Sequence, residues 1–467
     1  MNKPLRTYFF CGIGGSGMMP LAVLLKKQGH EIIGSDRSYD QGRTSDKFQA
    51  LKDIGIKIFP QDGSGVIKNI DELVVSSAVE DSIPDVKYAL DLDIPIIKRG
   101  QLLAQCFNSA EHKIAIAGTS GKSTVTGMVG TILTEMGENP TIVNGGEIRN
   151  LQLNKNDKFS NIRKGRDDLF IAEMDESDGS IEHYNPSIAV LNNIALDHKS
   201  MEELEQLFGD YLARSEKAVV VNYNQPCVKK LCKERAKSRI ISYSINDKSD
   251  LVAVNLVPKP NGIDFTLRYD GMNYNVHLNV AGRHNVENAL AAFGACASMD
   301  LDMNLAVKAI SKFNGIHRRM ENIGTKNGIT VFDDFAHNPD KISASLRSLK
   351  DFKGRLIVMF QPHGFSPLRL MRNEIVEAFS SNLGEDDILI MPEVYYAGGT
   401  VDRSVTAKKI IEDLKNGGVN AYWFDLRDEI PSFIGNIAKE GDRVVVMGAR
   451  DDTLHNFAYE IIDSLAM

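Results

Sequence analysis

The chain has 467 residues, with 54 basic and 62 acidic side chains for a net charge of −8, and 43% of it is hydrophobic. This length exceeds what one hydrophobic core usually supports, so three domains are the natural expectation. No apolar stretch approaches the roughly 20 residues of a membrane span, and no basic run is long enough to follow a nucleic-acid backbone, which argues against both classes of protein.

Cysteine usage and the start of the chain favour the cytoplasm. The cysteines are odd in number, scattered and never in CxxC spacing, so they suggest neither a disulfide framework nor a zinc site. They are Cys11, Cys106, Cys227, Cys232 and Cys296. The first dozen residues run directly into a glycine-rich turn rather than forming a long apolar core, which argues against a secretory signal.

The first segment alternates strands and helices, as a doubly wound sheet does. The expected elements are a strand at Thr7–Ile13, a turn at Gly14–Gly17, a helix at Met18–Lys27 and further strands at Glu31–Ser35, Glu72–Ser77 and Ile94–Arg99. We therefore predict a Rossmann-like domain over residues 1–108.

The turn of this segment reads Gly12-Ile-Gly-Gly-Ser-Gly17, and Asp36 ends the following strand. Taken alone, this pattern is an ordinary dinucleotide fingerprint and a weak signal. An NAD-dependent oxidoreductase is therefore one alternative interpretation.

The central segment, residues 109–315, is again α/β. Its expected elements are strands at Lys113–Ala117, Leu169–Glu173 and Ser187–Leu191, and a helix at Ser123–Met136. Between Asp250 and Val280 the pattern changes to short alternating strands with turn signals at Pro260-Asn261-Gly262 and Asp270-Gly271. We expect antiparallel hairpins there that decorate the central sheet.

The last segment, residues 316–467, resumes the alternation of strands and helices. Its expected strands are Ile329–Phe332, Arg355–Phe360, Asp387–Met391 and Arg443–Met447. The predicted fold class is therefore α/β with three domains: Rossmann-like, P-loop ATPase-like and Rossmann-like in chain order.

The strongest chemical signal is a compact glycine-rich loop between a strand and a helix. Such a loop points backbone amides at phosphate oxygens; Lys122 would bridge phosphates and Ser123 would place its hydroxyl on Mg²⁺. An ordinary β-α turn does not explain a lysine followed by hydroxyl residues. The residues expected to bind ATP are Gly118, Thr119, Ser120, Gly121, Lys122, Ser123 and Thr124.

This loop resembles the ATP loop of the Mur ligases, and further motifs follow in the order of that family. They are Asn144-Gly-Gly146, Glu173-Met-Asp-Glu-Ser-Asp178, Asp197-His198, Gly282-Arg-His-Asn-Val-Glu-Asn288, Arg318-Arg319 and Asp333-Asp-Phe-Ala-His-Asn-Pro339. The resemblance covers nearly the whole chain and is greatest to the alanine-adding branch.

The resemblance implies a cytoplasmic ligase of peptidoglycan synthesis that uses ATP and Mg²⁺. It would add L-alanine, or another amino acid, to the carboxylate of UDP-N-acetylmuramate through an acyl phosphate. The expected oligomeric state is a monomer or a homodimer. The first domain would bind the UDP-sugar, the second ATP, and the third would bind the amino acid and close on ATP.

The resemblance also implies roles for individual residues. Magnesium would be held by Ser123, Glu173 and His198, although an acidic loop or a lone histidine says little by itself. Catalytic roles fall to Lys122, His198, Arg318 and Arg319. The adenine segment is His284, Asn285 and Asn288, and Asp334 and His337 would close onto ATP from the third domain.

The substrate-binding residues are expected in the first and third domains. Those of the first domain are Gly12, Gly14, Gly15, Gly17 and Asp36 for the diphosphate of the UDP-sugar, with Ser76, Ser77 and Arg99 facing the nucleotide or the muramyl group. Those of the third domain are His363, Arg369 and Arg403.

The chain departs from the family pattern at several positions. Gly364 and Pro367 stand where arginines are expected, and Arg369 could compensate; Ala195 replaces an acidic residue. No lysine occurs between Ser200 and Glu216, which agrees with the alanine-adding branch. A recycling ligase that adds a peptide to the same sugar, and a catalytically silent relative, remain open beside the oxidoreductase.

Overall fold

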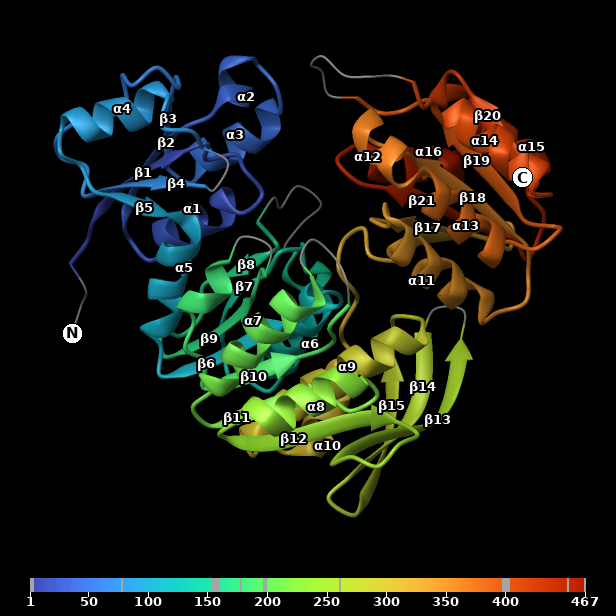
Figure 1. The fold of residues 1–467 in the computed structure, drawn as a ribbon, viewed down its shortest axis with the longest axis horizontal. Helices are drawn as coiled ribbons and strands as arrows, with labels where there is room; N and C mark the ends of the chain where they lie inside the picture. Colours follow the sequence, from blue (N-terminus) through green and yellow to red (C-terminus); the bar gives the residue numbers. More distant parts are fainter. Residues whose placement is uncertain are drawn as a thin grey trace. The chain divides into compact units, whose positions relative to one another are not determined.

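The computed structural model describes residues 4–76, 79–152, 159–176, 179–195, 200–259, 262–396, 404–451 and 453–465. They form an α/β structure with sheets of five, ten and six strands (Figure 1). The chain divides into two compact units. Unit 1 comprises Met1–Leu256, Asp264–Leu278 and His284–Asn314, and unit 2 comprises Val257–Ile263, Asn279–Arg283 and Gly315–Met467.

The five-stranded sheet of unit 1 is parallel and has the order β3-β2-β1-β4-β5. Its strands are β1 Thr7–Cys11, β2 Glu31–Ser35, β3 Lys57–Phe59, β4 Glu72–Val75 and β5 Ile96–Lys98; its helices are α1 Met18–Lys27, α2 Arg37–Asp40, α3 Ser45–Asp53, α4 Pro84–Asp91 and α5 Arg99–Asn108. This strand order is that of a Rossmann-like domain, as predicted.

Three predicted strands of this sheet are too long at their carboxyl ends. The strand predicted over Glu72–Ser77 ends at Val75, and the ends of the other two have a local cause. The first strand ends at Cys11 because Gly12 has a φ of 80°, which no strand residue adopts. The last ends at Lys98, since Arg99 begins α5 and the Gln101 side chain accepts a hydrogen bond from the Lys98 N–H at 3.4 Å.

The ten-stranded sheet has the order β15-β14-β13-β12-β11-β10-β6-β9-β7-β8. Its strands are β6 His112–Ala117, β7 Thr141–Val143, β8 Ile162–Arg163, β9 Leu169–Glu173, β10 Ile188–Leu191, β11 Ala218–Asn222, β12 Arg239–Ile245, β13 Leu251–Lys259, β14 Gly262–Tyr269 and β15 Met272–Leu278. The helices are α6 Lys122–Glu135, α7 Met201–Ala213, α8 Pro226–Arg235, α9 Arg283–Ser298 and α10 Met303–Ile310, with 3-10 turns η1 Arg149–Leu151 and η2 Ser180–His183. Strand β6 lies between β9 and β10 and pairs in parallel with both.

The segment from Asp250 to Val280 was expected to form antiparallel hairpins that decorate the central sheet, and its three successive strands lie side by side in that sheet. Strands β13 to β15 continue the sheet at one edge, and β13 pairs with β12 in parallel. The predicted turn at Asp270-Gly271 is confirmed, because both residues have positive φ, 49° and 73°. The other predicted turn includes residues 260 and 261, which lie outside the described residues.

Helix α5 joins the first two sheets into one hydrophobic core. Phe107 is fully buried and makes edge-to-face contacts with Phe170 of β9 at 5.6 Å and with Tyr184 at 5.3 Å. Asn108 donates a hydrogen bond to the carbonyl of His183 at 2.8 Å. The position where the chain passes from the first sheet to the second is therefore held by packing.

The six-stranded sheet of unit 2 has the order β16-β17-β21-β18-β19-β20, and β16 pairs antiparallel with β17. Its strands are β16 Glu321–Lys326, β17 Ile329–Asp334, β18 Leu356–Gln361, β19 Ile388–Pro392, β20 Ala421–Phe424 and β21 Arg443–Gly448. The helices are α11 Pro339–Lys350, α12 Phe365–Leu370, α13 Arg372–Asn382, α14 Ala407–Asn416, α15 Ile430–Ile437 and α16 Leu454–Ser464, with η3 at Arg427–Glu429.

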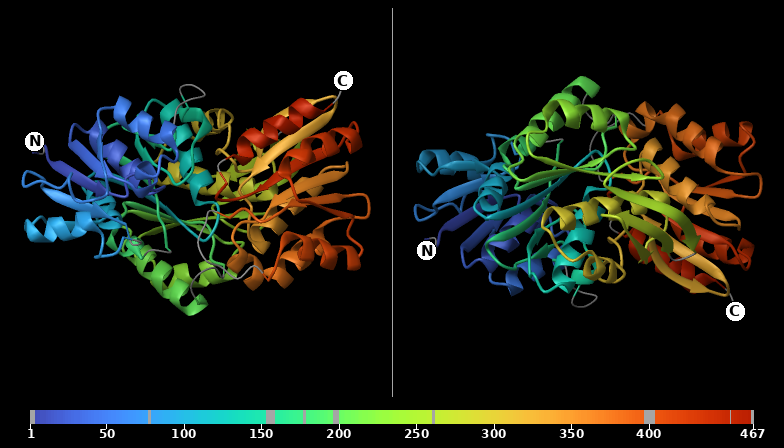
Figure 2. Two further views of the ribbon diagram at one scale, coloured as in Figure 1. Left: turned by 90° about the horizontal axis from the view of Figure 1, so that it is seen from above. Right: turned by 90° about the horizontal axis from the view of Figure 1, so that it is seen from below.

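Side chains of the central strand β21 alternate between two cores. Val445 and Met447 pack in the core that includes α11, α13 and α14, whereas Val444 and Val446 pack with α15 and α16. Figure 2 shows helices on both faces of this sheet. A strand buried on both faces carries apolar residues at every position, which explains its continuous Val-Val-Val-Met run. Within the described parts of the chain, no helix has the length and apolar character of a membrane span.

The contact between α9 and β11 requires a residue without a β-carbon. A Cβ at Gly294 would lie 2.4 Å from Cγ1 of Val220, a fully buried side chain. We expect Gly294→Ala to destabilise the protein by about 1–3 kcal/mol, because the added methyl group would displace either α9 or β11. Gly209→Ala in α7 is the control, since its Cβ would meet side-chain atoms of Arg235 and Leu231 at 3.2 Å. Thermal unfolding of both variants tests this; equal Tm values would contradict it.

Candidate active site

The glycine-rich loop connects the central strand β6 to helix α6, as predicted. Gly118 and Gly121 have φ of 138° and 80°, conformations that favour glycine, and α6 begins at Lys122. The free amides at the start of this 14-residue helix therefore follow the loop directly. A helix start of this kind attracts phosphate through its N–H groups and its dipole.

Two asparagines hold the loop from the neighbouring elements. A Cβ at Gly121 would lie 2.4 Å from Nδ2 of Asn192 and 2.5 Å from Oδ1 of Asn288. These two side chains hydrogen-bond to each other at 2.9 Å, and the buried Tyr243 hydroxyl donates to Asn192 at 2.6 Å. Asn288 is therefore a buried support of the loop rather than a helix cap.

Asn193 binds the other end of the loop. Its Oδ1 accepts hydrogen bonds from the Ser120 N–H and the Thr119 hydroxyl, both at 2.9 Å. Its Nδ2 donates to the Ser120 carbonyl at 3.0 Å. The loop is thus hydrogen-bonded to the carboxyl end of β10, and its backbone conformation is set before any phosphate binds.

A pair of oxygen ligands lies beside the loop. The Ser123 hydroxyl donates to Oε2 of Glu173 at 2.8 Å, and the Gly145 N–H donates to the same oxygen at 2.8 Å. Asn144 donates to the carbonyls of Ser123 and Gly146, while its buried Oδ1 has no hydrogen-bond partner. Hydroxyl and carboxylate oxygens are the donors that Mg²⁺ prefers, so Ser123 and Glu173 fit this ion.

Lys122 already has an anionic partner. Its amine donates to Oε2 of Glu176 at 2.7 Å and to the Gly118 carbonyl at 2.8 Å, and both side chains of the ion pair are largely buried. A phosphate in the loop would compete with Glu176 for this amine. Glu176 belongs to the predicted acidic motif but was not singled out as a site residue.

The first glycine-rich turn is held by Asp36. One carboxylate oxygen accepts from the Gly14 N–H at 2.8 Å, and the other caps α2 by accepting from the Ser38 N–H at 2.8 Å. A Cβ at Gly17 would meet the Arg99 side chain at 3.1 Å. Arg99 therefore lies against the turn, and its contact with the substrate stays a prediction.

The strand order places the remaining first-domain candidates at the same sheet edge. Phe10 pairs with Val74, so the turn containing Gly12 and Gly15 and the residue Ser76 follow the carboxyl ends of the adjacent strands β1 and β4. Ligands bind in α/β sheets at such a change of strand order.

The start of α9 carries three predicted adenine contacts. Asn285 and Asn288 are buried and hydrogen-bonded to each other at 3.1 Å. His284 is exposed. Of the three, His284 has the most accessible side chain. Asn288 instead lies against Gly121 of the loop.

The two adjacent arginines of unit 2 differ in their surroundings. Arg318 is buried and its guanidinium donates to Asp333 at 3.3 Å and to the carbonyls of Gly448 and Asp451 at 2.9 and 3.2 Å. Arg319 is exposed and stacks over the Phe335 ring at 5.0 Å. Only Arg319 therefore presents its charge to solvent.

Asp334 is an interior residue. It is buried and accepts hydrogen bonds from the Ser345 hydroxyl and from the Met320 N–H, the latter at 3.1 Å. Burial raises the pKa of Asp334. Its contacts hold the turn after β17 against α11.

Two histidines lie together at the carboxyl ends of β17 and β18. The rings of His337 and His363 are 5.5 Å apart, and burial lowers the pKa of both, that of His337 to about 4. Arg450, after β21, adds to the lowering at His363. Both imidazoles are therefore neutral at pH 7.

The departure at Gly364 has a backbone reason. Gly364 precedes α12 with a φ of 71°, a conformation that an arginine rarely adopts. Arg369 lies on α12 and is exposed. No described contact assigns it a substrate role, which stays a prediction.

Comparison with known proteins identifies the family. Residues 7–110 match the family model described as Mur ligase family, catalytic domain, residues 116–296 match Mur ligase middle domain, and residues 318–450 match Mur ligase, glutamate ligase domain. A UDP-N-acetylmuramate--L-alanine ligase of Sulfurihydrogenibium sp. (strain YO3AOP1) is 34% identical, with 95% of each chain covered. The chain belongs to the Mur ligase family.

Solved structures of the family share the fold. A UDP-N-acetylmuramate-alanine ligase from Thermotoga maritima superimposes with a TM-score of 0.79 at 24% identity, covering 98% of this chain and 99% of the other. A murein peptide ligase from Psychrobacter arcticus gives a TM-score of 0.68 at 24% identity, covering 98% of both chains. The resemblance and the predicted three-domain Mur ligase fold are confirmed, and the oxidoreductase interpretation is set aside.

Some predicted site residues of this Mur ligase cannot be placed. His198, Ser77 and Arg403 lie outside the described residues. Conversely, the prediction omitted Glu176, Asn192 and Asn193 of unit 1. The two asparagines directly follow the apolar run of β10, so parallel pairing of β10 with β6 could have indicated them.

Gly121 offers a test of the loop geometry. Gly121→Ala should weaken ATP binding by at least about tenfold, because its β-carbon would displace Asn192 and Asn288 in addition to straining the backbone. Gly271→Ala is the matched control: its φ is 73°, but nothing lies within 4 Å of its Cβ. Titration of a fluorescent ATP analogue measures both affinities, and an unchanged value for Gly121→Ala would contradict the role of this contact.

His337 predicts a pH dependence of unit 2. Its folded pKa of about 4 is below the ordinary value of 6.5, so the unfolded chain binds a proton in this range that the folded chain does not. Stability should fall as pH drops from about 6.5 to about 4, and His337→Gln should remove about 1–3 kcal/mol of that loss. Urea unfolding followed by the single tryptophan, Trp423 of β20, reports on unit 2. His277→Gln, an exposed position in unit 1, should keep the wild-type slope.

Proposed function

We propose that this Mur ligase joins L-alanine to the carboxylate of UDP-N-acetylmuramate at the expense of ATP, in peptidoglycan synthesis. The observation that carries the proposal is the convergence of the Ser123 hydroxyl and the Gly145 N–H on one oxygen of Glu173, beside Lys122 at the start of α6. The names of the relatives at about a third identity over the full chain support the choice of substrates.

Two steps make up the proposed reaction. A carboxylate oxygen of the sugar attacks the γ-phosphorus of ATP, and ADP leaves, which gives an acyl phosphate. The uncharged amine of alanine then attacks the carbonyl carbon, and inorganic phosphate leaves as the amide forms. The first step converts a carboxylate, a poor electrophile, into an activated acyl group.

The groups of unit 1 would act on the phosphates. The Lys122 amine would leave Glu176 and bind the β- and γ-phosphates, and the amides at the start of α6 would bind the same oxygens. Magnesium, held by Ser123 and Glu173 and by the predicted ligand His198, would neutralise their charge. His284 and Asn285 would contact adenine, and Asn288 would keep the loop in place.

The sugar nucleotide would bind at the first sheet. The turn from Gly12 to Gly17 would receive the diphosphate, and Arg99, which lies against Gly17, would add a positive charge. Ser76 and Ser77 would contact the nucleotide or the muramyl group. The sugar nucleotide would bind to residues 1–108 and ATP to residues 109–315. The amino acid would bind to residues 316–467.

In unit 2, we assign the contact with the transferring phosphoryl group to Arg319. Arg318 is committed to Asp333 and to two backbone carbonyls, so it would support the turn that presents Arg319. His337 and His363, both neutral, together with Arg369 and Arg403, would surround the amino acid. The proposed setting is the cytoplasm, where ATP is available, with the protein acting as a monomer or a homodimer.

A second candidate is a ligase that adds a whole peptide to the same sugar. It is favoured by the likeness to a murein peptide ligase and by Gly364, which stands where the family pattern has an arginine. A smaller residue leaves more room for a larger acceptor. Acceptor preference separates the two candidates.

The test is phosphate release from Mg-ATP with UDP-N-acetylmuramate, comparing L-alanine, other amino acids and the muropeptide tripeptide. Release should require L-alanine, and Lys122→Ala should lower kcat/KM by roughly 100-fold or more, because a charge on the phosphates is lost. Lys113→Ala is the matched control: Lys113 is equally buried on β6 and pairs with Glu216 at 2.9 Å, but at the opposite end of the strand. Dependence on tripeptide would establish the second candidate, and the absence of phosphate release with every acceptor would exclude both.

A further inference from the structure

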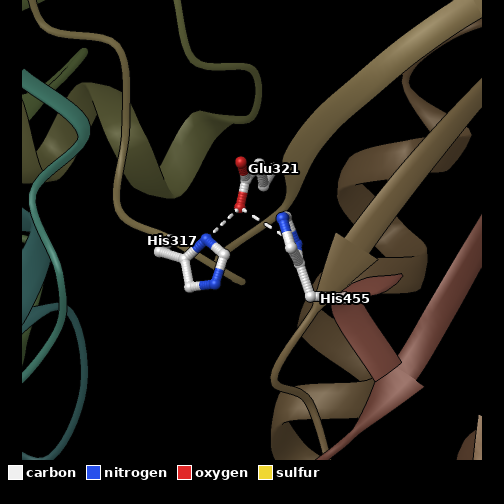
Figure 3. A group of neighbouring side chains, drawn as sticks. All are labelled: His317, Glu321 and His455. Atoms are coloured by element: carbon white, nitrogen blue, oxygen red, sulfur yellow. Dashed lines mark ion pairs between the residues drawn. The ribbon is translucent and has the colours of Figure 1, made fainter. Parts of the chain in front are cut away.

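A group of side chains of the types that bind metal ions lies in unit 2, whereas the proposed ATP loop belongs to unit 1. His317, Glu321 and His455 point toward one another (Figure 3), and one ligand atom from each lies within 4.8 Å of the others. Oε2 of Glu321 is 2.9 Å from Nδ1 of His317 and 3.9 Å from Nδ1 of His455. In the described part of the chain, no other group of three histidine, cysteine or acidic side chains comes this close.

Separate elements supply these side chains. His317 follows the point where the chain enters unit 2, Glu321 begins β16, and His455 lies in the first turn of α16. Between the first two, Arg318 and Met320 have positive φ, 56° and 47°. These turns bring two side chains four positions apart onto the same side without a helix.

A second carboxylate lies beside this group. Oδ2 of Asp333, on β17, is 3.0 Å from Nδ1 of His455. Asp333 is fully buried and Glu321 is 7% exposed, so two carboxylates lie close together out of water. Arg318 contacts Asp333 at 3.3 Å and supplies one positive charge. Two buried negative charges require further positive charge, because burial of uncompensated carboxylates is costly.

The spacing suits a tetrahedral ion. Ligand atoms about 2.0–2.1 Å from zinc in a tetrahedron are about 3.3 Å from one another. The distances from Oε2 of Glu321 to the Nδ1 atoms of the two histidines, 2.9 and 3.9 Å, lie on either side of that value. Two imidazole nitrogens with one carboxylate oxygen form a donor set that accepts zinc and similar first-row ions, with water as the fourth ligand, unlike the all-oxygen sites that calcium or magnesium prefers.

We propose that His317, Glu321 and His455 bind a divalent transition-metal ion of the zinc class, with water as the fourth ligand. The ion would add positive charge beside the buried carboxylates of Glu321 and Asp333 and fasten the entering chain to β16 and α16. It would be distinct from the magnesium proposed at Ser123 and Glu173. It would stabilise unit 2, since the three protein ligands come from separate elements of this unit.

The experiment measures metal binding and stability rather than ligation. The full-length protein, stripped with a chelator and kept in excess Mg²⁺ to occupy the oxygen site, is titrated with Co²⁺. About one equivalent should bind with the intense visible absorption of four-coordinate cobalt, and Zn²⁺ should displace it. Zn²⁺ should also raise the unfolding temperature of unit 2, followed by Trp423 fluorescence.

Variants assign the signal to this group of side chains. His455→Gln and Glu321→Gln should each lose the cobalt spectrum and the zinc-dependent rise in Tm. His277→Gln is the matched control. His277 forms an exposed pair with Asp264 in unit 1 at 2.6 Å, so this variant should keep both the cobalt spectrum and the zinc-dependent rise in Tm. If the wild-type protein shows no four-coordinate cobalt spectrum, or if the spectrum survives in both site variants, the proposal is overturned and the group is an ion-pair network with protonated histidines.

Discussion

The close approach of Gly121 to the amide pair of Asn192 and Asn288 is the contact on which the ATP loop depends. The three residues come from the loop, the end of β10 and helix α9, which are far apart in the sequence. Because glycine has no side chain, the loop can lie directly on the paired amides. Tyr243 orients this pair from β12. The loop therefore owes its shape to packing and would need little rearrangement to bind the phosphates proposed for it.

Strand order explains why the polar groups of unit 1 meet. Strands β6, β7, β9 and β10 are neighbours in the order β10-β6-β9-β7, and the residues after them lie at one edge of the sheet. That edge holds Lys122, Gly145, Glu173 and Asn192. A carboxylate at the end of β9 can thus reach a hydroxyl at the start of α6, which is the geometry that a magnesium-dependent phosphoryl transfer needs.

Unit 2 separates supporting charges from accessible ones. Arg318, Asp333 and Asp334 are buried and bind other parts of the same unit, whereas Arg319 remains exposed. The two adjacent arginines therefore differ in role: Arg318 supports the fold, and Arg319 presents its charge to solvent. The same interior network brings Asp333 beside His455, so a carboxylate that holds the Arg318 side chain also contacts the proposed metal group.

Much of the fold could be predicted from the sequence because its signals are local. These signals are apolar runs of four to eight residues, glycines at turns and the spacing of the proposed ATP loop, and each depends on only a few neighbouring residues. They predicted the three α/β segments, the loop and the motif order that identified the family. Even the errors at Cys11 and Lys98 are displacements of a strand end by one or two residues.

By itself, then, the sequence determined the fold class and the family, and it predicted residues for the site. Only the tertiary structure decided which of those residues are partners. Lys122 pairs with Glu176, which is 54 positions away, and Gly121 lies against Asn288, which is 167 positions away. His455 contacts Asp333 across 122 positions. Such contacts follow from strand order and helix packing, which depend on the burial of the whole chain rather than on any local pattern.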